Sequence, residues 1–267
     1  MSLPTKLMKN NYHTHMYLCR HAIGNVEDYV KEAIRIGLDS LGMSDHAPFA
    51  ELKDRSIRMD PDDFPTYLRE CDEAIRKYSG KIKIFKALEI EYFDGYEKMY
   101  EGYLRKLDYL ALGQHYISDA ASLRGLKSCY TLSTLGHVRT YVDTIIKALE
   151  SKFFRFVCHP DLMFYNIGKL DESIMNESSR LIRCAIENDI PLEINANGVR
   201  KGLRLLEDGV RYLYPRLEFW KKVREMGAKV IVSADAHDPS YLYDDGVLET
   251  YRFATQIGIE VEEALNI

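Results

Sequence analysis

The chain has 267 residues, of which 46% are hydrophobic and 29% are charged. This is enough apolar material for one large core. No run of about eighteen uncharged apolar residues predicts a membrane span. The formal net charge of −5 offers no basic surface to a nucleic-acid backbone. We therefore expect a single domain over residues 1–267 that binds neither a membrane nor a nucleic acid.

The N-terminus and the cysteines favour a cytoplasmic location. Residues 1–6 are expected to be an expression remnant or a frayed terminus, and they lack the basic-then-apolar pattern of a signal peptide. The five cysteines are odd in number and widely spaced, and they contain no Cys-x-x-Cys pair: Cys19, Cys71, Cys129, Cys158 and Cys184. This pattern argues against a disulfide framework and for a reducing compartment.

Short apolar segments alternate with longer segments of helical periodicity about seven times, which is typical of βα units and a mostly parallel sheet. Strands are expected at 9–13, 38–43, 82–88, 109–113, 155–158, 191–194 and 229–233. Helices are expected at 25–36, 132–149, 172–187 and 217–226, the first beginning at the capping residue Asn25 and ending before Gly37. The connections 48–61 and 117–133 exceed ordinary loop length and predict lids or substrate loops.

Side chains that bind metals or protons follow or close six of the predicted strands. In chain order they are His13 and His15, Asp45 and His46, Glu89 and Glu91, His115, His159 and Asp161, and Asp235 and His237. The carboxyl ends of the strands in a β/α barrel share one rim, where such folds hold their active sites. Residues at i and i+2 on extended backbone point the same way, so pairs such as His13 and His15 can converge there.

Imidazole and carboxylate together suit Zn²⁺, Mn²⁺ or Fe²⁺, whereas an all-oxygen Mg²⁺ or Ca²⁺ site needs no histidines. A single histidine is more often a surface residue than a ligand, but six of the eight histidines lie at or directly after a strand end. His137, at the start of a helix, is expected to be structural. His21 is equally compatible with metal binding and with a solvated loop, and Cys19 is expected to be unliganded.

The ordered set of motifs resembles the polymerase and histidinol phosphatase (PHP) family of metal-dependent phosphoesterases. The motifs are Tyr12-His13-Thr14-His15, His21, Ser44-Asp45-His46, Ala87-Leu88-Glu89, His115, Cys158-His159-Pro160-Asp161 and Ser233-Ala234-Asp235-Ala236-His237. Three further segments are similar to the histidinol-phosphate phosphatase branch of this family: Leu192-Glu193-Ile194-Asn195, Gly198-Val199-Arg200 and Tyr214-Pro215.

The resemblance implies a distorted (β/α)7 barrel, similar to a TIM barrel, with two or three divalent transition metal ions at the C-terminal ends of its strands. It implies one ion at His13, His15, Glu89 and Asp235, a second at Glu89, His115 and His159, and a third at His21, His46 and His237. Glu89 is preferred over Glu91 as a ligand because it aligns with the glutamate of the family.

The implied activity is hydrolysis of L-histidinol phosphate to L-histidinol and phosphate, in histidine biosynthesis, by a water molecule that the metals activate. Asp235 and His237 are expected to take part in catalysis, and Asp45 and Asp161 to orient ligand imidazoles or to protonate the leaving oxygen. Arg200 is expected to clamp the phosphate, since a guanidinium can hold two phosphate oxygens. Arg124 and Lys127 could reach the substrate, although a solvated loop is the better explanation for them.

Other readings remain open. The chain could be a phosphodiesterase or another phosphoesterase of the same family acting on a different small substrate. It could also be an amidohydrolase acting on a carbon centre, or a noncatalytic metal-binding protein. The acidic net charge disfavours a polynucleotide substrate. The expected partner is a small phosphorylated metabolite, and no oligomeric state is predicted.

Overall fold

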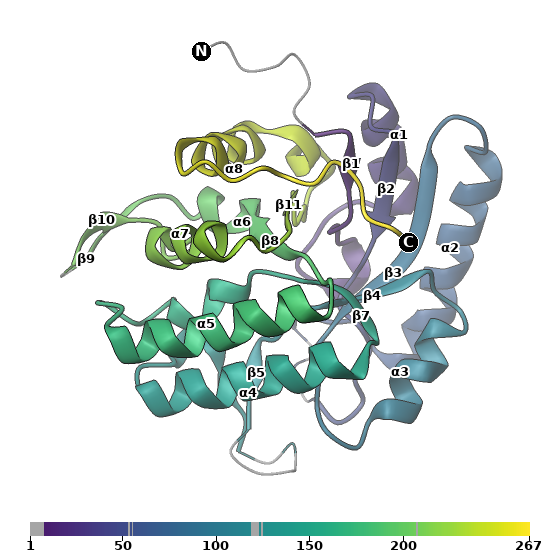
Figure 1. The fold of residues 1–267 in the computed structure, drawn as a ribbon. Coiled ribbons are helices and arrows are strands. Elements are labelled where there is room, and N and C mark those ends of the chain that lie inside the picture. Colours follow the sequence, from purple (N-terminus) through teal and green to yellow (C-terminus); the bar gives the residue numbers. More distant parts are fainter. Residues whose placement is uncertain (1–7, 53, 55, 119–122, 124, 207) are drawn as a thin grey trace.

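Seven parallel strands form the central sheet of the protein, in the order β1, β2, β3, β4, β7, β8 and β11. The computed structural model describes residues 8–52, 54, 56–118, 123, 125–206 and 208–267. The strands are β1 (Asn10–Asn11), β2 (Ser40–Met43), β3 (Lys83–Ile90), β4 (Tyr109–Leu112), β7 (Phe154–Val157), β8 (Leu192–Asn195) and β11 (Val230–Ser233). Helices connect most successive strands, and the sheet curls into a nearly closed barrel (Figure 1). All seven predicted strands are present, and residues 1–6 lie outside the described part of the chain.

The seam between β1 and β11 is closed by isolated contacts. In the part of the chain that the structure describes, Thr14 and Ala236 form a single parallel bridge in place of a ladder. The backbone N–H of Ala234 donates to the side-chain oxygen of Asn11 at 2.8 Å, and the Asn11 amide donates to the hydroxyl of Thr14. The asparagine side chain therefore satisfies a backbone N–H group that would otherwise be buried without a partner.

Most of the α-helices cover the outside of the barrel (Figure 1). The helices are α1 (Val26–Arg35), α2 (Phe64–Lys77), α3 (Glu97–Leu104), α4 (Leu135–Ser151), α5 (Glu172–Glu187), α6 (Ala196–Arg200), α7 (Leu217–Met226) and α8 (Asp245–Gln256). Asn25 caps α1 as predicted, in a reciprocal capping box with Asp28, and α5 and α7 have the predicted bounds. The predicted helix at 132–149 begins only at Leu135, because the Thr134 side chain accepts the N–H of His137 and so caps it there.

Short elements fill the connections. The 3-10 helices are η1 (Tyr17–Cys19), η2 (Pro61–Asp63), η3 (Cys129–Thr131), η4 (Pro160–Phe164) and η5 (Pro239–Tyr243). Strands β5 (Tyr116–Ile117) and β6 (Lys127–Ser128) pair across the connection expected as a long loop. Strands β9 (Arg204–Leu206) and β10 (Gly209–Arg211) form a hairpin that projects from the body of the protein (Figure 1).

Aromatic side chains fill the interior of the barrel below its C-terminal rim. Tyr12, Phe85, Tyr109 and Phe156 form a buried cluster, which Leu265 of the C-terminal tail covers from beneath. The Tyr109 hydroxyl donates to the Tyr12 carbonyl at 2.6 Å. A Cβ at position 42 would collide with that hydroxyl, so this strand position requires glycine. The rim of the barrel thus lies above an apolar floor.

Two further expectations concern cysteines and membranes. All five cysteines are buried and free, so no disulfide is formed. Among the described residues, no helix has the length and the apolar character needed to cross a bilayer.

The Glu27 carboxylate links α1 to the end of α2. It accepts from Lys31 at 2.8 Å, and from Lys77 and the Tyr78 hydroxyl at 2.9 Å each. These hydrogen bonds lower the pKa of Glu27 from its ordinary 4.5 to about 2. A carboxyl whose pKa is lower in the folded state stabilises the fold above its unfolded pKa, and this contribution is lost as the pH falls toward the folded pKa.

Glu27→Gln should therefore lower the Tm of the metal-free protein at pH 7, and the difference from the wild type should shrink as the pH falls below 4.5. Circular-dichroism melts across this range measure the difference. A Tm difference that stays constant down to pH 3 would contradict the assignment.

Candidate metal centre

The C-terminal rim of the barrel gathers the side chains that the strand ends were expected to deliver. Each lies on or directly after a strand of the central sheet or in the loop that follows: His13 and His15 after β1, His21 beyond η1, His46 after β2, Glu89 within β3, His115 after β4, His159 after β7, and Asp235 and His237 after β11. All are buried except His21, which is exposed, and His237, which is half-buried. Residues separated by more than 200 positions along the chain therefore meet in one cluster.

The carboxylate of Glu89 lies at the centre of this cluster. Its Oε2 atom faces the Nε2 of His13 at 3.3 Å, the Nε2 of His15 at 3.5 Å and the Nδ1 of His46 at 3.0 Å. Its Oε1 atom faces the Nε2 of His159 at 2.9 Å and the Nε2 of His115 at 3.6 Å. The two oxygens thus face two different groups of imidazoles, so the carboxylate would be available to cations held on either side.

Asp235 lies on the same side as His13 and His15. Its Oδ1 is 3.1 Å from the Nε2 of His15 and 3.7 Å from the Nε2 of His13. The side-chain amides of Asn195 and Asn197 donate to its Oδ2 at 3.1 and 3.2 Å, which fixes the orientation of the carboxylate. Donor atoms of His13, His15 and Asp235 all lie within 4.8 Å of one another, close enough to hold one ion.

Two members of the cluster have a left-handed backbone. The φ angle is 31° at His159 and 45° at Asp235, a region that costs a residue with a Cβ about 1–3 kcal/mol. Strain of this kind persists only where the surrounding structure determines the position of the residue. At both positions the strained backbone follows a strand end and turns the side chain toward the centre of the rim.

A third group of imidazoles stands beside the first. The ring centroids of His21 and His237 are 4.5 Å apart, and those of His21 and His46 are 5.4 Å apart. Cys19 and His15 also have donor atoms within reach of this group. The Nε2 atom of His237 is buried and has no hydrogen-bond partner among the described residues. Leaving a buried polar atom unpaired is unfavourable, and a cation bound there would satisfy it.

A layer of carboxylates lies behind the imidazoles and fixes their orientation. Glu193 is 2.8 Å from the Nδ1 of His13, Asp45 is 3.3 Å from the Nδ1 of His15, and Glu91 is 3.1 Å from the Nδ1 of His115. A carboxylate that accepts from one ring nitrogen leaves the other nitrogen free to bind a metal. Asp45 therefore has the expected orienting contact, while both oxygens of Glu91 face Arg58 and one also faces the Nδ1 of His115.

The charges of the cluster shift the pKa values of its members in opposite directions. Burial opposes the positive charge on His15, but contacts with Asp235 and Asp45 outweigh it and raise the pKa to about 9. Burial likewise opposes ionisation of Glu89, but the imidazoles around it, His13 foremost, lower the pKa of its carboxyl well below 4.5. Burial beside His15 lowers the pKa of His237 to about 3, so this ring is neutral near pH 7.

A cavity of about 350 Å³ opens above the cluster. Besides cluster members, it is lined by Ile57 from the 48–61 connection, Tyr130 from the 117–133 connection, Asn197, Lys201 and Tyr214. Each of the two long connections therefore contributes a residue to the cavity, as their length suggested. Lys201 is the one lysine or arginine among the described residues that line it.

Arg200 does not have the position that its expected role requires. Its guanidinium donates to Asp244 at 2.8 and 3.0 Å and to the carbonyls of Ala234 and Tyr241. Successive residues on a helix point about 100° apart, so the end of α6 turns Arg200 toward α8 while Lys201 reaches the cavity. Arg200 therefore braces the loop after β11 and does not line the cavity, where Lys201 lies instead. The helical phase of the short α6 was the missing signal.

The remaining expected residues lie elsewhere. Asp161 accepts from the backbone N–H of Arg216 at 2.6 Å and from the indole of Trp220 at 2.9 Å, so it anchors η4 to α7 instead of orienting an imidazole. Lys127 lies on β6 and is not among the residues that line the cavity. Arg124 falls outside the described residues. His137 accepts the N–H of Ser133 with its Nδ1 atom.

Sequence reasoning did not assign a role to Glu193. This fully buried carboxylate lies in the middle of the four-residue strand β8, and it also accepts the backbone N–H of His159 at 3.0 Å. An acidic residue within a short core strand is itself the signal, because a charge in that position must have a buried partner.

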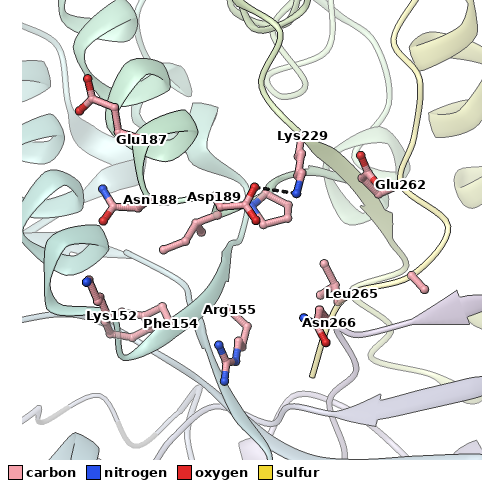
Figure 2. A pocket seen from close by; sticks show the side chains of 13 residues that line it. Lys152, Phe154, Arg155, Glu187, Asn188, Asp189, Lys229, Glu262, Leu265 and Asn266 are labelled. Atoms are coloured by element: carbon pink, nitrogen blue, oxygen red, sulfur yellow. Dashed lines mark ion pairs between the residues drawn. The ribbon is translucent and has the colours of Figure 1, made fainter.

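A second cavity of about 510 Å³ lies at the opposite end of the barrel (Figure 2). It is bordered by residues near the starts of β7, β8 and β11 and by the C-terminal tail. Lys229 and Asp189 face each other there at 2.6 Å. No histidine lines this cavity among the described residues, so the rim cluster is the candidate site.

Comparison with known proteins gives the following similarities. A family model described as the PHP domain matches residues 11–197. A probable histidinol-phosphatase of Deinococcus radiodurans is 27% identical over 244 residues, which cover 89% of this chain and 90% of that protein. The histidinol-phosphatase of Bacillus subtilis is 22% identical over an alignment of 272 residues, which covers 89% of this chain and 98% of that protein.

A solved structure has the same fold. The histidinol phosphate phosphatase of Lactococcus lactis subsp. lactis, crystallised with zinc, L-histidinol and phosphate, aligns with a TM-score of 0.70 at 16% identity. The alignment covers 98% of this chain and 100% of that chain. At this identity the likeness establishes the barrel fold.

The position of the Glu89 carboxylate depends on Gly113, which directly follows β4. A Cβ at position 113 would collide with the Glu89 side chain. Gly113→Ala should therefore displace the carboxylate and lower the number of transition metal ions bound per chain by at least one. Gly102→Ala is the matched control, since a Cβ there would meet its nearest neighbour, Arg105, only at 3.7 Å.

Inductively coupled plasma mass spectrometry of the two variants measures this number. Circular dichroism should find both folded, because forcing a methyl group into a packed site costs about 1–3 kcal/mol. Wild-type metal content in Gly113→Ala would show that the placement of Glu89 does not control metal binding.

Proposed function

The chain belongs to the PHP domain family, and from this membership and the geometry of the rim we propose that it is a metal-dependent histidinol-phosphate phosphatase. It would convert L-histidinol phosphate and water into L-histidinol and phosphate, a reaction of histidine biosynthesis. The observation that carries the proposal is the buried Glu89 carboxylate, with imidazoles on both of its oxygens, beneath a cavity that one lysine lines.

We propose that the cluster holds two or three divalent transition metal ions, with zinc, manganese and iron as candidates. His13, His15, Glu89 and Asp235 would hold one ion, and Glu89, His115 and His159 a second. His21, His46 and His237 would hold a third. Seven imidazoles and two carboxylates form the donor set that such ions prefer. When bound, these ions neutralise phosphoryl oxygens and lower the pKa of a water molecule to near neutrality.

Residues of the chain position the reacting groups around this centre. Asp235 is held by Asn195 and Asn197 at 3.1 and 3.2 Å, so its free oxygen keeps its direction toward His15. His237 lines the cavity next to Asp235, and its ring is neutral near pH 7. Asp45 contacts the Nδ1 atom of the His15 ring and so orients this ring, whose Nε2 atom points toward Glu89 and Asp235.

Lys201 takes the role of phosphate anchor in this proposal. Its ammonium group is a point charge that suits one phosphate oxygen, and the metals would hold the others. Ile57 and Tyr130, which also line the cavity, are left for the organic part of the substrate. A volume of about 350 Å³ suits a small monoester, which is why a monoester is preferred over a polymeric diester.

Substrate preference tests the proposal directly. Histidinol phosphate should give a kcat/KM at least about 100-fold above that of p-nitrophenyl phosphate, because a shaped pocket adds this much discrimination. It should also exceed that of bis(p-nitrophenyl) phosphate. A higher kcat/KM for the diester would support the phosphodiesterase alternative and end the substrate assignment.

Metal removal tests the same proposal from the other side. Dialysis against a chelator should abolish hydrolysis of histidinol phosphate, and added Zn²⁺ or Mn²⁺ should restore it. Undiminished activity in protein shown to be free of metal would rule out a metal-dependent phosphatase.

Substitution of Lys201 separates substrate binding from metal binding. Lys201→Met should raise the KM for histidinol phosphate about 10- to 100-fold, the value of a lost charge-assisted hydrogen bond, and leave the metal content unchanged. Lys221→Met, an exposed lysine of α7, is the control and should change neither quantity. An unaltered KM in Lys201→Met would remove Lys201 from the substrate site.

A further inference from the structure

The connection at 48–61 sends a charged side chain into the protein behind the rim cluster. The guanidinium of Arg58 donates to Glu91 through two nitrogens, at 2.9 Å to Oε1 and 3.2 Å to Oε2, and to the carbonyl of Ala47 at 3.3 Å. Only 2% of Arg58 and 1% of Glu91 is exposed. The two residues therefore form a bidentate ion pair that is removed from solvent. Ile57, which directly precedes Arg58 in the chain, lines the cavity.

Glu91 connects this ion pair to the cluster. Its Oε1 atom, which accepts from Arg58, is also 3.1 Å from the Nδ1 of His115. The other nitrogen of that ring, Nε2, faces Glu89. A continuous chain of contacts therefore runs from Arg58 through Glu91 and His115 to the carboxylate at the centre of the cluster.

The energetics of the pair indicate a role other than stability. Removing two charges from water is unfavourable, and a buried ion pair often contributes no net stability compared with apolar residues of similar size. A carboxylate behind a histidine ligand, in contrast, sets the orientation and the tautomer of the ring. Mutation of such a carboxylate typically weakens metal binding about 10- to 100-fold. Glu91 occupies this position, and Arg58 holds both of its oxygens.

We propose that Arg58 is a positioning residue for the metal centre: through Glu91 it fixes His115, so that tight binding of the ion at His115 and His159 depends on the buried pair of Arg58 and Glu91. The inference rests on the proposed metal centre but not on the identity of the substrate. Arg58 is not one of the proposed ligands: its guanidinium donates to Glu91 and to the carbonyl of Ala47.

Zinc binding by the full-length chain tests the proposal. The metal-free protein is titrated with Zn²⁺ by calorimetry, and the bound zinc is counted by mass spectrometry. Arg58→Met should weaken one zinc equivalent about 10- to 100-fold and leave the others unchanged. Arg58→Lys keeps the charge and should recover part of the affinity. Unaltered zinc binding in Arg58→Met would overturn the proposal.

A double-variant comparison assigns the affected ion. His115→Ala removes the ligand on which Arg58 is proposed to act, so adding Arg58→Met to His115→Ala should weaken zinc binding no further. An additional loss of the same size on this background would mean that Arg58 acts elsewhere, and it would overturn the proposal. Arg69→Met is the matched control, because Arg69 pairs with Glu73 on the exposed surface of α2.

Metal-free stability separates positioning from a merely structural role. Glu91→Leu leaves Arg58 as an unpaired buried charge, whereas Arg58→Met/Glu91→Leu leaves none. The double variant should therefore melt above Glu91→Leu, yet retain its zinc defect, because no acceptor faces the Nδ1 atom of His115. Zinc affinity that returns together with the Tm would overturn the proposal.

These measurements need no substrate. A chain that binds zinc as described but does not hydrolyse histidinol phosphate would refute the proposed function and leave this inference intact. A chain that hydrolyses histidinol phosphate, but whose zinc affinity is unchanged in Arg58→Met, would support the proposed function and refute this inference.

Discussion

The carboxylate of Glu89, buried among imidazoles at the mouth of a barrel, is the constraint on which the rest of the site depends. A charge removed from water must be compensated by partners that are equally fixed, because an uncompensated buried charge is strongly destabilising. Five imidazoles face its two oxygens, and Gly113 leaves the space that the carboxylate occupies. The apolar floor around Tyr109 and Phe156 closes the barrel beneath it.

The barrel contributes more than a ring of ligands. Strand β8 supplies no imidazole, yet Glu193 and Asn195 on this strand orient His13 and Asp235. Arg58 would extend the same principle to a connecting segment, by holding the carboxylate behind His115. The cluster is therefore defined by two layers: the inner one offers donor atoms to cations, and the outer one fixes the directions in which these atoms point. The left-handed backbone at Asp235 belongs to this arrangement.

The alternation of side chains along strands and the common rim of a parallel barrel predict the inner layer from sequence. His13 and His15 converge because extended backbone places residues i and i+2 on one side. The same rule could not separate Glu89 from Glu91, since their difference depends on Arg58, which lies 33 positions from Glu91 in the chain. Asp161 was misassigned for a similar reason, because its partner Trp220 is 59 positions away. Local patterns identify donors, whereas their partners follow from tertiary contacts.

The most direct test is a crystal structure of the zinc-loaded protein with diffraction recorded at the zinc absorption edge. The account predicts anomalous peaks on both sides of the Glu89 carboxylate, one beside His13, His15 and Asp235 and one beside His115 and His159. Anomalous peaks confined to other parts of the protein, with none next to Glu89, would contradict it.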